Sequence, residues 1–565
     1  MDYFNRFEIE RFLRRTAGTV GALVLLAASE AGVVAQPSIQ APVLKWQYAG
    51  CYSSWCETGW YASPAVIDLD GDGSVEVIAS AYSIVVLDGA TGALQWRMAS
   101  GHDRSEPGAS SVGRTWPGIV VADIDDDGLP EIATAHSAGW VSVYDHQGYF
   151  ESGWPKRPTT NELRGLVVAD LDGDDTMEII VGGAIGSSTN TWVLEHNGTS
   201  RPGWPRVGGG AGYAWGTYND NAAVADLDGD GNSEVVAPSD VHYICAYQDN
   251  GTPLPTHSDY GAKVWGEVGV WESPAIELRG WGRCDTSYGR AERNRTNFAD
   301  GPAAIADMDD NGSLEIIAAG NTYDCAMSPY KSLYSGVFIF NRDRSRFTGS
   351  GFDWTTVPLD TGAPISENYN VIESAHPNPV VVDLDGDDLK EILFPSYDGR
   401  MHAFWLDKTE HGSWPFPIHN PAEGFYRFAT EPVVADLNGD GRAEVIFASW
   451  VEKGTDETGK LHILSDQGVP IHEIDLPGAY GSPDWNGALA APTLDNLDSD
   501  PDLEIVLNTA HSGFVAYDLP GTAGARVLWS TGRGGYRRAG VAERGLIFTD
   551  GFESGDTTAW TNTIP

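Results

Sequence analysis

The stretch Asp68-Leu-Asp-Gly-Asp-Gly-Ser-Val-Glu76 decides how this chain is interpreted, because the same nine-residue pattern recurs along its 565 residues. Each copy begins where an apolar run ends, continues through alternating acidic residues, and closes on Glu before a second apolar run. The further copies run from Asp123 to Glu131, Asp170 to Glu178, Asp226 to Glu234, Asp307 to Glu315, Asp383 to Glu391, Asp436 to Glu444 and, in a poorer form, Asn496 to Glu504.

The spacing of the oxygen-bearing side chains fits a calcium ion. Calcium is a hard cation that takes roughly 6–8 oxygen ligands at about 2.3–2.6 Å. Side chains at loop positions 1, 3 and 5 can converge inside a tight turn, position 7 supplies a backbone carbonyl, and the carboxylate at position 9 closes the shell. In the first copy the side-chain ligands would be Asp68, Asp70, Asp72 and Glu76. We therefore expect one Ca²⁺ ion per loop, seven or eight in all, with a mainly structural role.

The predicted metal ligands occupy these five positions in every copy. They are Asp68, Asp70, Asp72, Ser74, Glu76, Asp123, Asp125, Asp127, Leu129, Glu131, Asp170, Asp172, Asp174, Thr176, Glu178, Asp226, Asp228, Asp230, Asn232, Glu234, Asp307, Asp309, Asn311, Ser313, Glu315, Asp383, Asp385, Asp387, Leu389, Glu391, Asp436, Asn438, Asp440, Arg442, Glu444, Asn496, Asp498, Asp500, Asp502 and Glu504.

Position 6 of the loop indicates a special backbone conformation. Glycine fills it in five copies, as at Gly73, and Asp175 and Asp388 replace it in two others. Glycine adopts a positive φ without strain, and Asp tolerates it moderately well, so we expect a positive φ there. In the eighth copy position 6 is Pro501, whose φ is fixed at a negative value. That loop is therefore expected to differ or to bind weakly.

The segments around each loop predict β-strands. Runs such as 65–67 and 77–79 are short and β-rich, whereas an EF-hand has flanking helices and its last Glu at position 12. Two more strand-like runs follow each pair, and four antiparallel strands make a propeller blade. We predict an all-β fold, a β-propeller with eight blades or alternatively seven, with the calcium loop between the first two strands. The runs 43–46 and 527–530 both look like a fourth strand, and either could complete the closing blade.

With its strands and loops, the chain resembles the FG-GAP/VCBS repeat family, in which integrin α-subunit propellers carry similar calcium loops. Seven good copies of Asp-Leu-Asp-Gly-Asp-Gly or a close variant, each with Glu behind it, carry this resemblance over roughly Ser63 to Trp529. The Phe-Gly and Gly-Ala-Pro elements of integrin repeats do not recur with the loops, and the form Ala-Val-Ala-Asp-Leu-Asp is more similar to bacterial members. The resemblance implies a calcium-binding propeller, without an integrin-like ligand site.

The N-terminus has the pattern of an export signal. Arg14 and Arg15 precede an apolar run from Thr16 to Ala28, and Val33-Val34-Ala35 is a small-residue cleavage site. The run is too short to span a bilayer, and no second stretch could do so. We divide the chain into a signal peptide (1–35), a lead-in strand with a cysteine loop (36–62), the propeller (63–540) and a tail (541–565). The protein is expected to be secreted or held at the cell surface.

The five cysteines favour disulfides, as is usual in exported proteins. We expect Cys51 and Cys56 to close a small loop, and Cys284 and Cys325 to pair across one repeat core. Cys245 lies in a strand-like run and is expected to be a buried free thiol.

The charge balance narrows the functional classes. The chain has 80 acidic and 35 basic residues, a formal net charge of −45, which repels nucleic acid and suits a protein that holds cations. The usual nucleophile and metalloprotease motifs are missing. We therefore predict a monomeric binding or adhesion module for a protein or glycan, more than an enzyme. Trp265, Trp271 and Trp281, in an insertion at 252–298, are the first candidates for ligand contact.

The alternative function is that of a polysaccharide lyase. Some rhamnogalacturonan lyases are similar eight-bladed propellers with comparable calcium loops, and in them a basic residue takes a proton. The matching candidates here lie in the insertions at 252–298 and 321–376, and they are Arg283, Arg290, Arg293 and His376. Nothing in the sequence favours one of them over the others.

Overall fold

The computed structural model describes residues 39–542, apart from 52–55, 185–188, 208–220, 240–241, 279–293, 299–300, 325–331, 359–363, 367, 369, 374–377 and 482. All of them belong to one compact unit, Ser38–Pro565. The expected signal peptide, most of the tail, Cys284 and Cys325 lie outside the described residues. Among the described residues no helix has both the length and the apolar character needed to cross a membrane.

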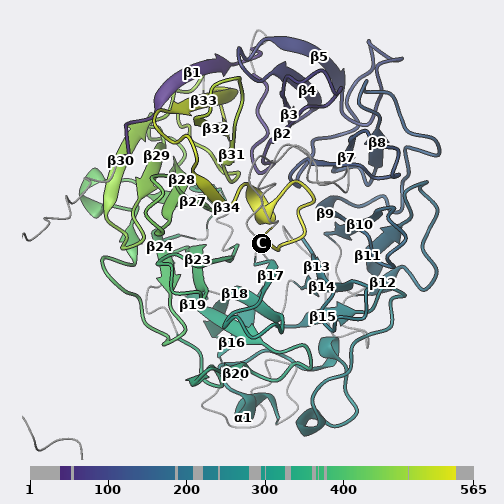
Figure 1. Cartoon of the computed structure of the whole chain (residues 1–565), viewed down its shortest axis with the longest axis vertical. Coiled ribbons are helices and arrows are strands. Elements are labelled where there is room, and N and C mark those ends of the chain that lie inside the picture. The colour runs from purple at the N-terminus through teal and green to yellow at the C-terminus, as the bar shows by residue number, and fades with distance from the viewer. Residues whose placement is uncertain are drawn as a thin grey trace, which may run out of the picture. The chain divides into compact units, whose positions relative to one another are not determined.

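Eight antiparallel sheets follow one another around a ring and form an eight-bladed β-propeller (Figure 1). The innermost strands are β2 (Ala65–Ile67), β6 (Val120–Ala122), β9 (Leu163–Ala169), β13 (Ala223–Ala225), β17 (Ala303–Ala306), β22 (Val380–Val382), β27 (Val433–Asp436) and β31 (Thr493–Asp495). The second strands are β3 (Glu76–Ser80), β7 (Glu131–Ala135), β10 (Glu178–Gly183), β14 (Glu234–Pro238), β18 (Glu315–Asp324), β23 (Glu391–Pro395), β28 (Glu444–Val451) and β32 (Leu503–Asn508). This arrangement confirms the prediction of eight blades.

The outer half of each blade is more variable. The third strands are β4 (Ser83–Asp88), β8 (Val141–Tyr144), β11 (Thr189–Leu194), β15 (Ile244–Tyr247), β19 (Ser332–Phe340), β24 (Arg400–Phe404), β29 (Lys460–Leu464) and β33 (Phe514–Leu519). Outer strands are described in five blades, as β5 (Leu94–Ala99), β12 (Arg206–Val207), β25 (Phe416–Pro417), β30 (Pro470–Asp475) and β1 (Val43–Tyr48). In the second and fourth blades the described outer segment pairs only through isolated bridges, such as Tyr144 with Phe150 and Tyr247 with Pro253.

Short additional elements decorate the ring. β16 (Asn294–Asn297) and β26 (Arg427–Ala429) extend the fifth and seventh blades, and β20 (Thr348–Gly349) pairs with β21 (Phe352–Asp353). The insertion after β15 contains the 3₁₀ turns η1 (Ser258–Tyr260) and η2 (Trp265–Glu267) and the short helix α1 (Pro274–Glu277).

The core lies between neighbouring blades. β3 and β7 are buried at every residue, because each sheet packs another blade against both of its faces. One cluster joins Val120 and Ala133 of the second blade to Leu166, Val168 and Ile179 of the third. This two-sided burial explains why the inner strands are continuous apolar runs without polar alternation.

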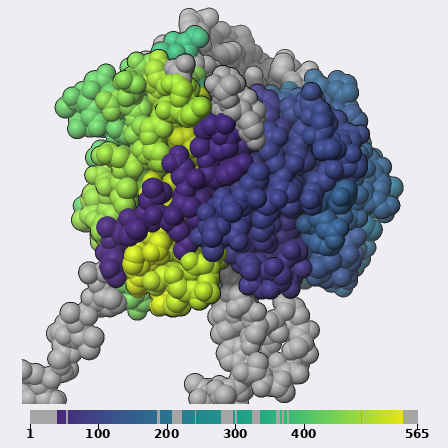
Figure 2. All heavy atoms as spheres, turned by 90° about the horizontal axis from the view of Figure 1, so that it is seen from above, coloured from purple at the N-terminus to yellow at the C-terminus, as the bar shows by residue number. Residues whose placement is uncertain are grey.

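The ring is closed by the N-terminal strand. β1 pairs antiparallel with β33, so the strand made first completes the last blade. Figure 2 shows the purple N-terminal strand lying against the yellow residues of that blade. Of the two runs that were candidates for this place, 43–46 fills it. The other forms β34 (Arg526–Trp529), which pairs with the innermost strand β27 and lies at the centre of the ring (Figure 1).

The segment 526–542, which we call the central plug, lies inside the channel and contacts successive blades. Carbonyl groups of the plug accept hydrogen bonds from backbone N–H groups of inner strands in five blades. The bonds are Leu494 to Ser530 (2.8 Å), Val121 to Tyr536 (3.3 Å), Val168 to Arg537 (3.1 Å), Val224 to Ala539 (2.9 Å) and Ile305 to Gly540 (2.8 Å). The plug therefore pairs the inward-facing edges of innermost strands, which a ring of blades would otherwise leave open.

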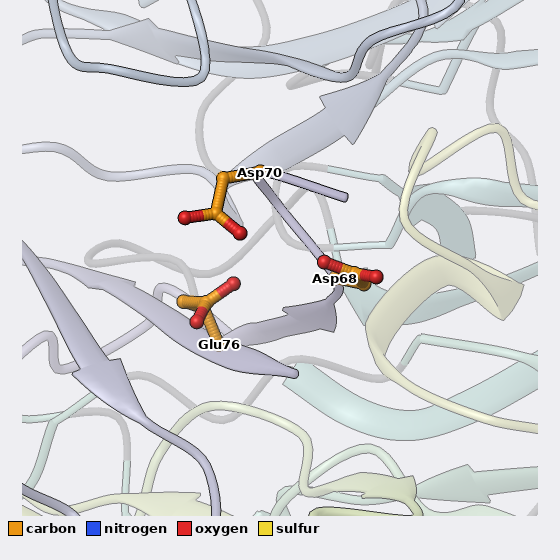
Figure 3. A group of neighbouring side chains, drawn as sticks. All are labelled: Asp68, Asp70 and Glu76. Carbon is orange, nitrogen blue, oxygen red and sulfur yellow. The ribbon is translucent and has the colours of Figure 1, made fainter. Parts of the chain in front are cut away.

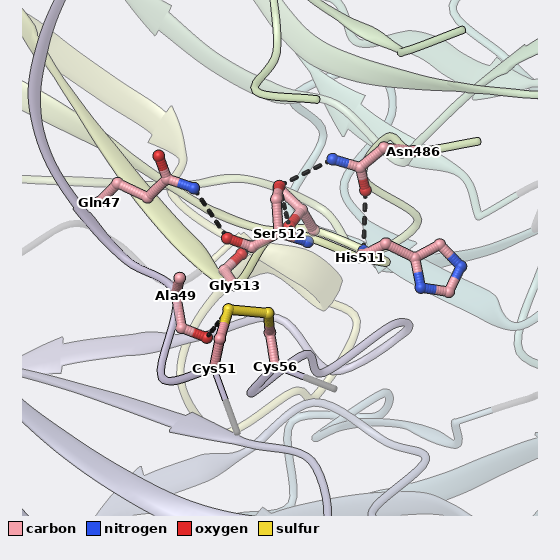
Figure 4. The surroundings of a disulfide bond; sticks show 9 residues. Gln47, Ala49, Cys51, Cys56, Asn486, His511, Ser512 and Gly513 are labelled. Carbon is pink, nitrogen blue, oxygen red and sulfur yellow. Dashed lines mark hydrogen bonds between the residues drawn. A yellow bond between two sulfur atoms is a disulfide. The ribbon is translucent and has the colours of Figure 1, made fainter. Parts of the chain in front are cut away.

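The Cys51–Cys56 disulfide is formed, as expected, and lies just after β1 (Figure 4). Cys245 is a buried free thiol, also as expected. The segment that carries the disulfide passes from the outer strand of the last blade to the innermost strand of the first. Gln47 of β1 donates to the carbonyl of Ser512 at 2.9 Å (Figure 4). This bond holds the start of the connecting segment against the last blade.

Candidate functional site

Each acidic loop connects the end of an innermost strand to the start of the second strand, and one contact recurs in all eight. The Glu at position 9 folds back and accepts a hydrogen bond from the backbone N–H at position 2. The distances are 2.9 Å for Leu69 to Glu76, 2.7 Å for Ile124 to Glu131, 2.8 Å for Leu171 to Glu178, 2.8 Å for Leu227 to Glu234, 3.1 Å for Met308 to Glu315, 2.7 Å for Leu384 to Glu391, 2.9 Å for Leu437 to Glu444 and 2.7 Å for Leu497 to Glu504. One oxygen of each Glu thus fixes the loop, while the second oxygen remains for another partner.

The first residue of the loop sets the turn. In seven copies the Asp at position 1 accepts from the N–H at position 6, as in Gly73 to Asp68 at 2.9 Å and Asp388 to Asp383 at 3.1 Å. Position 6 has a positive φ in these seven copies, which confirms the expectation from the sequence. Position 4 also has a positive φ in the same copies, from 54° at Asp310 to 79° at Gly386, which the sequence analysis missed.

The turn brings the carboxylates together. Seven groups of three or more side chains in the described part of the chain have potential ligand atoms within 4.8 Å of one another. Figure 3 shows the first group, in which Asp68, Asp70 and Glu76 face one another across the loop. Four further groups, in the second to fifth loops, contain Asp123, Asp125, Asp127, Asp170, Asp172, Glu178, Asp226, Asp228, Asp230, Asp307, Asp309 and Glu315.

The electrostatics of these groups call for a cation. Burial, reinforced by the neighbouring Asp385, Asp387 and Asp383, raises the pKa of Glu391 to about 9. Burial likewise raises the pKa of Glu131 to about 8. In the sixth loop Asp385 Oδ1 and Glu391 Oε1 are buried with no hydrogen-bond partner. Buried carboxylate oxygens without donors fit a hard cation such as Ca²⁺, which binds through oxygen alone.

Basic or amide side chains reach the second oxygen of the closing Glu in four of the eight loops. Gln95 Nε2 donates to Glu76 at 2.8 Å in the first loop. Arg201 lies 2.9 Å from Asp172 and 3.1 Å from Glu178 in the third. Arg342 pairs with Asp228 in the fourth and lies 3.8 Å from Glu234.

The eighth loop is different from the others. Lys45 of β1 places its ammonium between Asp498 and Glu504, where it donates to both and lies 2.8 Å from Glu504 Oε1. Neither position 4 nor position 6 of this loop has a positive φ. Asp502, expected at position 7, instead accepts from the N–H groups of Gly521 at 2.9 Å and Ala523 at 2.8 Å. The loop therefore differs in shape, as the proline at position 6 predicted.

The opposite face of the propeller carries a cluster of aromatic rings and arginines. It comprises Trp60, Tyr61, Arg114, Trp116, Arg164, Trp485 and His511, and we call it the aromatic–arginine face. All of these residues precede or begin an innermost strand or connect a second strand to a third. In antiparallel blades those connections lie at the end away from the acidic loops.

The rings and guanidinium groups of this face stack on one another. Two cations approach the Trp116 ring, with Arg114 Cζ 3.6 Å and Arg164 Cζ 4.3 Å from its centroid. Tyr61 stacks on the same ring with centroids 5.3 Å apart. Tyr61, Trp116 and Arg164 also line a pocket at the mouth of the central channel.

The second half of the face continues from Arg114. Its Cζ lies 5.0 Å from the Trp60 ring, which meets the Trp485 and His511 rings edge to face at 6.0 Å and 5.6 Å. Trp60 has a φ of 52°, which is uncommon for a bulky residue. Burial lowers the pKa of His511 to about 4, so this ring is neutral near neutral pH.

The sequence predicted ligand contact by other aromatic residues, and for two of the three this prediction was wrong. Trp265 and Trp271 are buried, with 0% and 2% of their surface exposed, and offer no ligand surface. Trp265 Nε1 donates to the carbonyl of Arg342 at 2.8 Å, which holds the insertion against the fifth blade. Trp281, Arg283, Arg290, Arg293 and His376 lie outside the described residues.

The sequence matches a family model for the FG-GAP-like repeat at residues 123–181 and 383–447. The chain contains FG-GAP-like repeats. The two matched stretches span the second, third, sixth and seventh acidic loops, together with strands on either side. No curated protein sequence matches the chain.

Solved structures with a similar course of the chain have low sequence identity. The biofilm matrix protein Bap1 of V. cholerae is 14% identical with a TM-score of 0.39, over 86% of this chain and 91% of that one. The rhamnogalacturonan lyase YesW is 15% identical with a TM-score of 0.44, over 84% of this chain and 75% of that one. BamB from Moraxella catarrhalis is 16% identical with a TM-score of 0.42, over 81% and 99% of the two chains.

Proposed function

We propose that this protein is an exported, calcium-binding β-propeller that acts as a binding module for an acidic glycan. The observation that carries the proposal is the aromatic–arginine face at the mouth of the channel. Its residues, most of them half-buried, combine aromatic rings, on which sugar rings stack, with guanidinium groups, which pair with carboxylates.

Arg114 is the residue that points to an anionic ligand. Several described arginines pair with carboxylates, including Arg164 of the same face, which lies 2.8 Å from Glu162. Within the described part of the chain, the Arg114 guanidinium has no carboxylate partner and contacts only the Trp60 and Trp116 rings. The Arg114 guanidinium therefore keeps its positive charge available on an aromatic surface, although the protein as a whole is strongly acidic. Such a cation attracts a negatively charged ligand locally.

The calcium ions are proposed to stabilise the fold rather than to hold the ligand. The acidic loops lie at the face away from the aromatic–arginine face, so a ligand on one face does not reach the other. Without a cation the clustered carboxylates repel one another. An ion that binds only the folded state adds stability by linkage.

The Cys51–Cys56 disulfide supports the proposal of export, because disulfides persist in oxidising compartments. We propose residues 1–35 as the signal peptide, 36–62 as the lead-in, 63–540 as the propeller and 541–565 as the tail.

The test is binding of an oligogalacturonate, a chain of carboxylated sugars, by isothermal titration calorimetry at saturating calcium. A neutral oligosaccharide of equal length is the control ligand. W116A and R114Q are expected to weaken binding at least about tenfold, or about 1.4 kcal/mol. R104Q is the matched control, because Arg104 covers the Trp96 ring at 5.4 Å, outside this face.

Two outcomes would contradict the proposal. Equal affinity of wild type, W116A and R114Q would show that the ligand binds elsewhere. Release of unsaturated products that absorb in the ultraviolet would replace binding by the lyase activity considered above.

A further inference from the structure

Lys45 and Gln95 occupy the same place in two different blades. In the first blade β5 pairs with β4 in a register that shifts between Leu94 and Trp96, so Gln95 is the extra residue of a bulge. In the last blade β1 pairs with β33 in a register that shifts between Leu44 and Trp46, so Lys45 is the extra residue. A bulge turns its extra side chain away from the regular alternation.

Both bulge residues reach the acidic loop of their own blade. Gln95 Nε2 donates to Glu76 Oε1 at 2.8 Å, and Lys45 Nζ donates to Glu504 Oε1 at the same distance. Lys45 also bonds to Asp498, which stands at loop position 3. The ammonium therefore lies between the two carboxylates that the equivalent loops keep for a shared cation.

The remaining residues of the eighth loop do not fit a metal ion. Position 1 is Asn496, whose amide donates to the carbonyl of Asp500 at 2.6 Å. Pro501 has no N–H to offer at position 6. The carboxylate of Asp502 is bound to backbone N–H groups outside the loop. Too few free oxygens converge to replace the roughly 6–8 ligands that calcium takes.

We propose that the Lys45 ammonium takes the place of a metal ion in the eighth loop, so that the ring is closed by an internal cation. The protein then has seven metal loops and one salt-bridged loop. Lys45 has only 14% of its side chain exposed and joins residues 459 positions apart, in the strand and the loop of the closing blade. The first strand and the last blade are thereby held together at every calcium concentration.

This inference rests on the proposed metal loops and is independent of the ligand of the opposite face. The first experiment counts the calcium bound by wild type, Q95K and K45Q after equilibrium dialysis with atomic emission detection. Q95K places an ammonium at the bulge of the first blade, so it is expected to bind one ion fewer than wild type. An unchanged count in Q95K would overturn the idea that an ammonium at this position displaces the ion.

The second experiment measures hydrogen exchange of residues 43–48 in calcium and in chelator. In wild type the exchange rates of β1 are expected to change less than about threefold on chelation, whereas K45Q is expected to exchange at least about tenfold faster in chelator. K460Q is the matched control, because Lys460 lies in another blade and pairs with the exposed Asp475 at 3.8 Å.

The outcomes separate the two proposals. Calcium-dependent protection of β1 in wild type, or an eighth ion bound by wild type, would overturn the role of Lys45. Wild type that binds no calcium would refute the metal loops, and the exchange of K45Q would still decide whether Lys45 fastens the ring.

Discussion

Arg538 offers the sharpest test of how the central plug stabilises the propeller. Its guanidinium is fully buried and makes five hydrogen bonds, of which three join the plug to the first two blades and two lie within the plug. Nε donates to Ile119 O at 2.9 Å, Nη1 to Thr531 Oγ1 at 2.8 Å and Gly532 O at 2.9 Å, and Nη2 to Ser63 O and Pro64 O at 3.0 Å each. The perturbation is R538A, which removes all five donors.

The expected loss follows from these bonds. A net contribution of about 1 kcal/mol for each buried hydrogen bond gives a destabilisation of about 5 kcal/mol. The carbonyl oxygens of Ser63, Pro64 and Ile119 would be left buried without this donor, which acts in the same direction. R526A removes an exposed arginine of the same plug and is expected to change stability by less than about 0.5 kcal/mol.

The assay is urea denaturation at saturating calcium, followed by the fluorescence of the 20 tryptophans. A change of less than about 1 kcal/mol in R538A would refute the reasoning, because it would show that the plug adds little to the ring. R538K keeps the charge but offers fewer, differently directed donors, so an intermediate loss is expected.

Three further predictions follow from the loops and the core. Chelation should lower the urea midpoint, since each loop contributes about 2.7 kcal/mol when free calcium is a hundredfold above its Kd; an unchanged midpoint would mean that the loops hold no metal. R201Q should raise the calcium affinity of the third loop by about tenfold in calorimetric titration, because a cation 2.9 Å from Asp172 competes with the ion; weaker binding would instead make Arg201 a support of the loop. Burial lowers the pKa of His136 to about 3. Below about pH 6.5 the unfolded chain takes up a proton at this residue and the folded chain does not. The free energy of unfolding should therefore fall by roughly 3 kcal/mol from pH 7 to 4. In chelator, H136Q should lose that part of the pH dependence; an identical slope would show that other groups cause it.

The sequence was sufficient to predict the fold and the loops because both depend on local patterns. Asp at position 1 and a residue that tolerates a positive φ at position 6 define the same turn in each copy. Position 6 has a positive φ in seven copies, as the sequence predicted. The number of blades followed from counting the repeats. The disulfide between Cys51 and Cys56 was predictable because five positions separate the two residues.

The aromatic–arginine face and the plug could not be predicted in the same way, because distant segments build them. Trp60, Trp116 and Trp485 meet only when blades from both ends of the chain stand side by side. Trp265 and Trp271 misled for the opposite reason, since their insertion folds back and buries them. One signal in the sequence was available. Lys45 and Gln95 each precede a tryptophan in an outer strand, so aligning the two strands would have placed them at equivalent positions.

The pairing of β1 with β33 has a consequence for how the chain is made. The first strand has no partner until the chain beyond residue 514 has been synthesised, so the ring forms late and through contacts of long sequence separation. A product truncated within the last blade leaves β1 unpaired, and a product that lacks β1 exposes the edge of β33. Such fragments are complementary, and mixing them should reconstitute a nicked ring, while two damaged copies should exchange the strand and dimerise.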